Sequence, residues 1–173
     1  MTERMLVFAP HPDDEILGCG GLIALAAKEH LVRVIVVTDG ARGMPPGSLE
    51  AAAIRLDECR RGLARLGAAE PMFLGYPDGE VPLSGPILER YRRAVAEFRP
   101  TRILLPSTGE QHADHRAVTR GVLCALEGCW RRELWFYETT QPAGAVNATL
   151  DISAVVEDKR AALAEHASQM KQF

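Results

Sequence analysis

The sequence contains no long apolar segment. No run of its 173 residues approaches the roughly 18–20 consecutive apolar residues that cross a lipid bilayer. The apolar stretch near the N-terminus, MLVFAP, is shorter than the core of a secretory signal peptide, and no small-residue cleavage site follows it before charged residues appear. We therefore expect a cytoplasmic protein with no membrane partner.

Paired cysteines and excess basic charge are also lacking. None of the four cysteines forms a CxxC pair, so no disulfide framework is expected. The 20 Lys and Arg residues against 23 Asp and Glu residues give a formal charge of −3. The chain therefore lacks the positive charge that neutralises nucleic-acid phosphates, and we expect no nucleic-acid partner. Repeats and long polar linkers are absent as well, which favours a single domain over residues 1–173.

What the sequence does have is a regular alternation of two patterns. Short apolar runs rich in β-branched residues, such as RVIVVT at 33–38, are typical of strands buried on both faces. Between them lie longer segments with apolar residues three and four apart, which predict helices. The predicted strands are 5–9, 32–38, 72–74, 103–105, 134–137 and 146–152. The predicted helices are 16–29, 49–66, 87–98, 114–127 and 153–170.

This alternation predicts an α/β protein with a three-layer Rossmann-like fold, in which helices cover both faces of a mostly parallel, doubly wound sheet. Because crossovers are right-handed, we expect a strand order of about 3-2-1-4-5. The first and fourth strands are then neighbours, and the chain reverses direction between them. Ligands bind such sheets beyond the carboxyl ends of the strands at this point. The loops after these two strands are therefore the expected place for chemistry.

Both of these loops are rich in histidine and aspartate. PHPDDE at 10–15 follows the first strand and QHADH at 111–115 follows the fourth, and together they hold three of the five histidines. Imidazole and carboxylate ligands suit zinc, iron(II) and other first-row divalent metals. The acidic residues could instead be favoured at helix starts by the helix dipole, and the histidines could be surface residues. The occurrence of both clusters at the switch point favours a metal site.

The same residues resemble a known family. PHPDDE followed by a distant HADH is similar to the two motifs of the LmbE-like (PIG-L) family of metal-dependent N-acetylglucosaminyl deacetylases, which are HPDDE preceded by Ala or Pro, and HxDH. Further features that look like the family's occur at 38–40, 55–58, Lys159 and 166–169, so the resemblance spans nearly the whole chain. It implies a deacetylase whose substrate is a small N-acetylated sugar.

The resemblance implies a ligand set and a general base. It places the metal, Zn2+ or alternatively Fe2+ or another first-row ion, on His11, Asp14 and His115. Such an ion lowers the pKa of water and polarises an amide carbonyl. Asp13 matches the family's general base, a carboxylate that takes a proton from water without binding the metal itself.

Three more residues receive roles from the resemblance. His112 matches the residue that stabilises the oxyanion or protonates the leaving amine, and Asp114 is expected to orient His112 and hold it charged. Arg55 matches an arginine that reaches towards substrate or acetate, although it could instead be a helix-surface residue paired with a nearby acid. Asp78 follows the third strand, where it could line the sugar site or simply belong to a turn.

The chain also departs from the family pattern. It is shorter at its C-terminal side than most members, so we expect part of the pocket wall to be missing or supplied otherwise, by a neighbouring subunit or by a fusion partner. Because relatives are often oligomers, the resemblance implies a homo-oligomer. Two rival interpretations are a hydrolase that uses the same site on another amide or glycoconjugate of secondary metabolism, and a non-catalytic metal-binding relative. A nucleotide-binding domain is disfavoured, because no glycine fingerprint follows the first strand.

Overall fold

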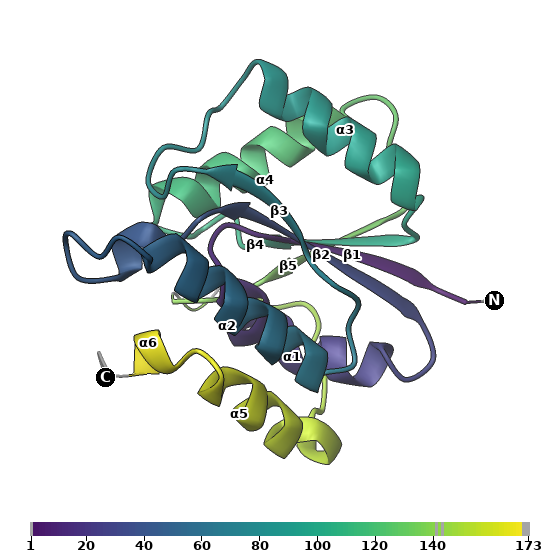
Figure 1. Cartoon of the computed structure of the whole chain (residues 1–173). Helices are drawn as coiled ribbons and strands as arrows, with labels where there is room; N and C mark the ends of the chain where they lie inside the picture. Colours follow the sequence, from purple (N-terminus) through teal and green to yellow (C-terminus); the bar gives the residue numbers. More distant parts are fainter. Residues whose placement is uncertain (1, 141, 143, 171–173) are drawn as a thin grey trace.

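Five parallel strands form one sheet. A computed structural model describes residues 2–140, 142 and 144–170. The strands are β1 (Arg4–Ala9), β2 (Leu31–Thr38), β3 (Met72–Tyr76), β4 (Arg102–Pro106) and β5 (Glu133–Tyr137). They lie in the order β3-β2-β1-β4-β5 with every pairing parallel, as Figure 1 shows. The predicted fold class and strand order are confirmed.

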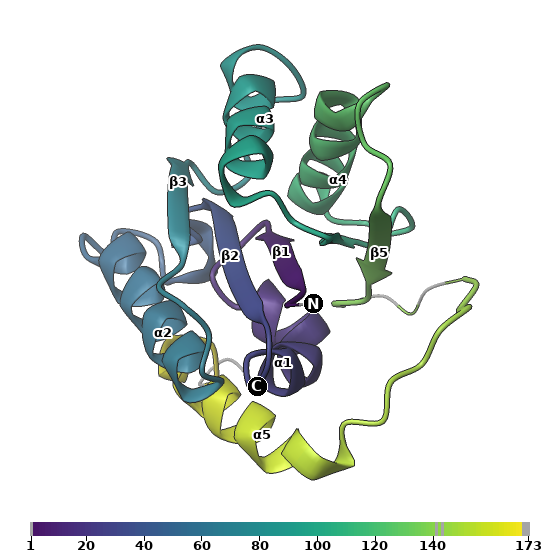
Figure 2. The same cartoon turned by 90° about the vertical axis from the view of Figure 1, so that its right-hand side faces the viewer.

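Helices cover both faces of the sheet. The helices are α1 (Asp14–Ala26), α2 (Ala51–Arg65), α3 (Pro86–Phe98), α4 (Ala113–Leu126), α5 (Val156–Ala164) and α6 (Ala167–Met170), with 3-10 turns η1 (Ala41–Gly43) and η2 (Ser153–Val155). One face carries α3 and α4, and the other carries α1 and α2 with α5 and α6 outside them (Figures 1 and 2). Among these helices of the described chain, none combines the length and the hydropathy of a membrane span.

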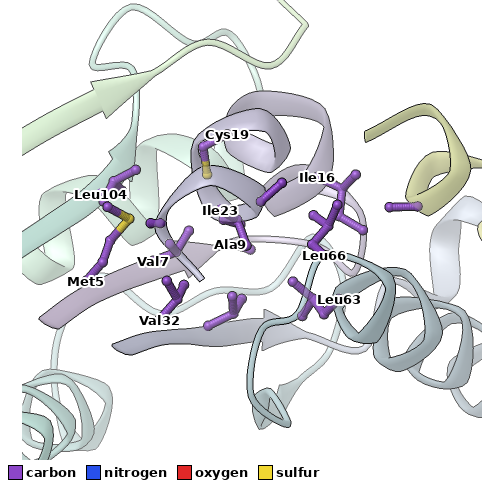
Figure 3. Close-up of a cluster of buried hydrophobic side chains, with 14 of the residues drawn as sticks. Met5, Val7, Ala9, Ile16, Cys19, Ile23, Val32, Leu63, Leu66 and Leu104 are labelled. Carbon is purple, nitrogen blue, oxygen red and sulfur yellow. The ribbon is translucent and has the colours of Figure 1, made fainter. Parts of the chain in front are cut away.

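The central strand β1 divides its side chains between two cores. Successive residues of a strand point to opposite faces, so Met5, Val7 and Ala9 pack beneath α1 and α2, whereas Leu6 and Phe8 pack beneath α3 and α4. Figure 3 shows the first of these clusters, with side chains from the sheet and from α1 and α2 meeting between the layers. All five residues are at most 1% exposed, so β1 is fixed on both faces and its carboxyl end is a rigid base for the loop that follows.

The predicted strand at 146–152 is wrong. This segment pairs with no strand, and Val146 and Leu150 are 60% and 48% exposed. The chain leaves β5 at the edge of the sheet and crosses to the opposite layer, as Figure 2 shows, so the segment has no strand to pair with. Only Ile152 is partly buried, where its side chain packs closely against Gly21 of α1.

The predicted C-terminal helix at 153–170 is broken, and the predicted helix at 49–66 begins later than expected. α5 ends at Ala164, and α6 begins at Ala167, because the backbone N–H of Ser168 donates to the Glu58 side chain at 2.8 Å instead of to a carbonyl of its own helix. At the other position, α2 begins at Ala51, and Leu49 is fully exposed. In both places local apolar spacing predicts a longer helix than the tertiary contacts allow.

Candidate metal centre

The two loops rich in histidine and aspartate meet at the carboxyl edge of the sheet. β1 pairs with β4, so the loop into α1 and the loop into α4 leave the sheet side by side. The first loop turns tightly, because the backbone N–H groups of Asp13 and Asp14 both donate to the carbonyl of His11, at 2.9 and 3.3 Å. In the second loop, His112 Nδ1 accepts the backbone N–H of Asp114 at 3.2 Å and so caps α4.

Three side chains from these loops converge on one point. His11 Nδ1 lies 3.0 Å from Asp14 Oδ2, His115 Nε2 lies 3.1 Å from the same oxygen, and the two nitrogens are 3.3 Å apart. Ligands of a tetrahedral zinc ion at about 2.0–2.1 Å would be separated by roughly 3.3 Å. Two further sets of ligand atoms lie within 4.8 Å of one another: His11, His112 and His115, and His11, Asp78 and Asp114.

The charges around His11 also suit a cation. Burial lowers the pKa of His11, but hydrogen bonds to three carboxylates outweigh burial and raise it to about 12. Burial likewise favours the neutral form of Asp14, yet contacts with His11 and His115 hold its pKa well below the usual range. The carboxylates are Asp14, Asp78 and Asp114. Such an excess of negative charge around imidazoles fits the donor set of a divalent metal.

Asp78 and Asp114 contact the outer nitrogen of His11. His11 Nε2 lies 3.2 Å from Asp114 Oδ2 and 3.3 Å from Asp78 Oδ1. Asp114 Oδ2 also accepts the backbone N–H of Gly79 at 2.7 Å, and Asp78 Oδ2 accepts that of Arg42 at 3.1 Å. The Asp114 carboxylate thus contacts His11, and these contacts do not support its predicted role of orienting His112. Asp78 reaches the centre from the turn after β3, where its sequence context is also that of an ordinary turn.

His112 lies beside the two converging imidazoles. Its ring centroid is 4.7 Å from that of His11 and 5.0 Å from that of His115. Burial and the charges of these two neighbours lower the pKa of His112, although Asp114 opposes the shift. Asp114 thus acts on the pKa of His112 in the predicted direction, but burial and the two imidazoles outweigh it, and the charge of His112 stays a prediction.

His115 is held from its other side by residues that the sequence analysis missed. Its Nδ1 lies 3.2 Å from Thr139 Oγ1 and 3.8 Å from Glu110 Oε2. Glu110 is buried, and its Oε1 accepts both the backbone N–H and the hydroxyl of Thr139, at 3.0 and 2.6 Å. Thr139 follows β5, so its approach to His115 depends on the strand order and has no local sequence signal.

Asp13 contacts α2 through one oxygen of its carboxylate. Arg55 Nη2 donates to Asp13 Oδ2 at 3.0 Å and to the Pro12 carbonyl at 3.4 Å. Burial and the charge of Asp14 raise the pKa of Asp13 to about 6, against the opposing effect of Arg55. Arg55 is only 3% exposed. These contacts support a role beneath Asp13 rather than the predicted contact of Arg55 with substrate.

The fold and the centre together define a class: parallel α/β proteins with a His/Asp-rich site at the switch point of the sheet. A family model narrows this class. The model of PIG-L, described as GlcNAc-PI de-N-acetylase, matches residues 6–126, which is more than half of the chain. The chain belongs to the PIG-L family, and the resemblance inferred from its two motifs is confirmed.

Relatives of known activity cover nearly the whole chain. Diacetylchitobiose deacetylase of Thermococcus kodakarensis is 29% identical over 97% of this chain and 70% of its own length. 2'-N-acetylparomamine deacetylase of Streptomyces fradiae is 30% identical over 96% of this chain and 73% of its own. Among solved structures, N,N'-diacetylchitobiose deacetylase from Pyrococcus horikoshii has a TM-score of 0.79 at 26% identity, covering 96% of this chain and 70% of that one. Each of these proteins is a deacetylase.

A protein with a different reaction also shares the fold. GalB, the 4-carboxy-2-hydroxymuconate hydratase of Pseudomonas putida KT2440, has a TM-score of 0.85 over 99% of this chain and 81% of its own, at 23% identity. At this identity the likeness shows the fold alone. The fold therefore accommodates more than one reaction, and the chemistry has to be argued from the side chains at the centre.

Proposed function

We propose that this protein is a zinc-dependent N-deacetylase, with iron(II) as the alternative metal, that hydrolyses the acetamido group of an N-acetylglucosamine-type sugar. The observation that carries the proposal is the triangle of His11 Nδ1, Asp14 Oδ2 and His115 Nε2 at the switch point of the sheet. Membership of the PIG-L family and the deacetylase relatives favour this reaction over others that the fold accommodates.

In this proposal, His11, Asp14 and His115 hold the metal. A divalent cation bound there supplies a Lewis acid that polarises an amide carbonyl and makes water more acidic. His11 can offer Nδ1 as a ligand only when its proton is on Nε2, and that nitrogen faces Asp78 and Asp114. These two carboxylates accept the Nε2 proton in a hydrogen bond and so fix the ligating tautomer of His11.

Glu110 and Thr139 fix the ligating tautomer of His115. The His115 ring must offer Nε2 towards Asp14 and carry its proton on Nδ1. Thr139 Oγ1 lies 3.2 Å from that Nδ1, and the hydroxyl donates its own proton to Glu110 Oε1. The lone pairs of Thr139 Oγ1 are therefore available to accept from His115. Buried Glu110 thus acts on the ligand through one intervening hydroxyl.

Asp13 and His112 complete the reaction. Asp13 takes a proton from water as the new C–O bond forms at the acetyl carbonyl, and returns it to the amide nitrogen as the C–N bond breaks. Acetate and a free amine are the products. His112 Nδ1 accepts a backbone N–H from Asp114, so a neutral His112 carries its proton on Nε2. That N–H donates to the developing oxyanion, and no charge on the imidazole is needed.

Metal content and acetate release test this proposal together. The full chain, purified without chelator, is expected to hold about one zinc or iron per molecule and to release acetate from N-acetylglucosamine or diacetylchitobiose. Asp13→Asn is expected to keep its metal and to lose roughly 10²–10⁴-fold in turnover, because it removes a general base but no ligand. His115→Ala removes a ligand and should lose the metal itself.

Asp158→Asn is the matched control, because it neutralises an exposed aspartate on α5 in the same chemical way. It should retain both metal and turnover. The proposal is contradicted if the wild-type chain takes up neither zinc nor iron(II), or if Asp13→Asn retains turnover within about tenfold of wild type.

A further inference from the structure

Helix α2 buries two opposite charges on the side that faces the rest of the molecule. Arg55 and Glu58 are each 3% exposed. Burying a charge is costly unless hydrogen bonds or an opposite charge compensate it. Arg55 has its partner in Asp13, as described above. Glu58 finds its partners in α6, a segment 110 residues later in the sequence.

Ser168 satisfies both oxygens of Glu58. Its backbone N–H donates to Glu58 Oε1 at 2.8 Å, and its hydroxyl donates to Glu58 Oε2 at 2.6 Å. Hydrogen bonds to an ionised carboxylate are the stronger kind, and two of them fix orientation as well as distance. The pair therefore anchors α6 on α2 at the same place where the C-terminal helix is broken.

The neighbouring residue of α6 extends this anchor to the loop above Arg55. Gln169 Nε2 donates to the carbonyl of Gly43 at 3.0 Å. The backbone of Gly43 lies directly against the guanidinium, since a Cβ at this position would overlap Arg55 Nη1. A Cβ on Gly40 would likewise stand 3.3 Å from Arg55 Cζ. Gln169 thus holds in place the backbone that closes over Arg55.

This enclosure and the hydrogen bonds of one guanidinium nitrogen together position Arg55. Its Nη2 contacts Asp13 and the Pro12 carbonyl, whereas its Nε has no hydrogen-bond partner among the residues that the structure describes. A guanidinium with a free Nε could rotate away from Asp13 if the backbone of Gly43 and α6 moved. Contacts remote from Asp13 therefore contribute to the position of the Arg55–Asp13 pair.

We propose that Glu58, Ser168 and Gln169 form a clasp that holds Arg55 against Asp13 and thereby fixes the direction of the Asp13 carboxylate. These three are positioning residues, because they act through Arg55 and touch neither substrate nor metal. The inference rests on the proposed function in one respect, namely that Asp13 is the general base. Its structural part, the dependence of Arg55 on α6, can be measured without any turnover.

The test uses paired variants in the full chain. Ser168→Ala removes the hydroxyl donor, and Gln169→Met removes the amide donor at nearly constant shape. Each should lower kcat about 10–100-fold with KM and metal content unchanged, because a small displacement of a catalytic group has effects of this order. Ser168→Thr keeps a hydroxyl and should restore kcat. Glu165→Gln is the control, because it weakens the exposed contacts of Arg61 and Arg65 on α2 with the link before α6 and should leave kcat unchanged.

A second measurement follows Arg55 itself. In protein labelled with 15N-arginine, a buried and paired guanidinium should give resolved, slowly exchanging Nη signals, which the spectrum of Arg55→Lys identifies. Ser168→Ala and Gln169→Met should broaden or remove these signals, and Ser168→Thr should retain them. Thermal unfolding of each variant establishes that it is folded before either measurement is interpreted.

The outcomes separate the two proposals. Unchanged kcat and unchanged Arg55 signals in both loss variants would overturn the clasp. If wild-type protein releases no acetate from any N-acetylated sugar, the proposed function fails, and the Arg55 signals alone then judge the clasp: their loss in Ser168→Ala supports it, and their retention overturns it. A fall in kcat in which Ser168→Thr is as impaired as Ser168→Ala would also overturn it.

Discussion

The two helical layers of the molecule bury different kinds of side chain. Beyond the first turn of α4, the layer formed by α3 and α4 buries no charged side chain in the part of the chain that the structure describes. Its core is built from residues such as Leu6, Phe8 and Ile103. The layer formed by α1, α2, α5 and α6 has an apolar cluster of similar size, but it also buries charged or ionisable side chains: Glu15, Arg55, Glu58 and His166.

We call the layer of α3 and α4 the apolar layer, and the layer of α1, α2, α5 and α6 the polar layer. The apolar layer mainly stabilises the fold, whereas the polar layer also supports the residues of the centre. Apolar burial is favourable wherever it occurs, whereas burying an ionisable group is costly unless a partner compensates its charge or the group stays neutral. Burial, and then the charge of Asp13, raise the pKa of Glu15 to about 8, which favours the neutral form of this carboxyl next to Cys59. The polar layer is thus the one that contacts the loop carrying Asp13, through Arg55 of α2. We attribute its buried ionisable side chains to this contact.

The strongest test of this difference is a substitution in the apolar layer alone, which should change stability without changing turnover. Ile103 is fully buried near the amino end of β4, remote from the carboxyl edge that carries the centre. Ile103→Ala should lower the free energy of unfolding by about 2–5 kcal/mol, because it removes buried methyl groups and leaves a cavity. Urea unfolding measures the loss, and acetate release per folded molecule should be unchanged. Loss of turnover in the fully folded variant would contradict the view that the layer of α3 and α4 stabilises the fold without supporting the centre.

Low pH should destabilise the polar layer through His166. Burial, and then the positive charges of Arg55 and Arg61, lower the pKa of His166 to about 4, although Glu165 opposes the shift. The unfolded chain therefore binds this proton more tightly than the folded one. The stability contributed by neutral His166 is complete above pH 6.5 and is lost as the pH falls towards 4, by about 2 kcal/mol at pH 5.

The matched variant for this prediction is His166→Leu, which cannot bind a proton. Urea unfolding of both proteins at pH 7.5 and pH 5 gives the comparison. The wild-type protein should lose about 2 kcal/mol more than the variant between these two conditions. Equal losses would mean that His166 titrates in the folded protein as it does in the unfolded chain.

The smallest expected effect concerns Tyr91, a residue of the apolar layer with a buried hydroxyl. Tyr91 is fully buried between α3 and the sheet, its ring meets Phe8 edge to face at 5.4 Å, and its hydroxyl has no hydrogen-bond partner among the described residues. Tyr91→Phe keeps the ring and removes an uncompensated polar group, so it should raise the free energy of unfolding by about 1 kcal/mol. Destabilisation in urea unfolding would show that the hydroxyl has a partner after all.

The sequence predicts the fold well where local pattern and tertiary structure agree. β1 and β2 each contain a continuous apolar run, and a central parallel strand buries both faces of such a run. The pattern fails at 146–152 and at 153–170. There the apolar residues follow a plausible period, but the edge of the sheet ends at β5, and Glu58 takes the N–H of Ser168 out of the helix.

The same distinction applies to the centre. The strand order sets the loops that hold His11, Asp14 and His115 side by side, and the resemblance to the family is what selects these three residues within the loops. Asp78 and Glu110 cannot be assigned in that way. Asp78 has the context of a turn, and the link from Glu110 to His115 passes through a residue beyond β5. A residue that reaches the metal site only through another side chain belongs to no recognisable motif spacing in the sequence.

The long sequence separations within the centre have a consequence for synthesis. His11 is made early, yet His115, which contacts it, follows 104 residues later, and the Glu58–Ser168 bonds close over 110 residues. Loop closure over such distances is slow, and it depends on the parallel sheet being in place first. His11 meets Asp14 at once but has to wait for His115 until the loop after β4 has been made. Metal uptake by the growing chain would then report the pairing of β1 with β4 rather than the first local contacts.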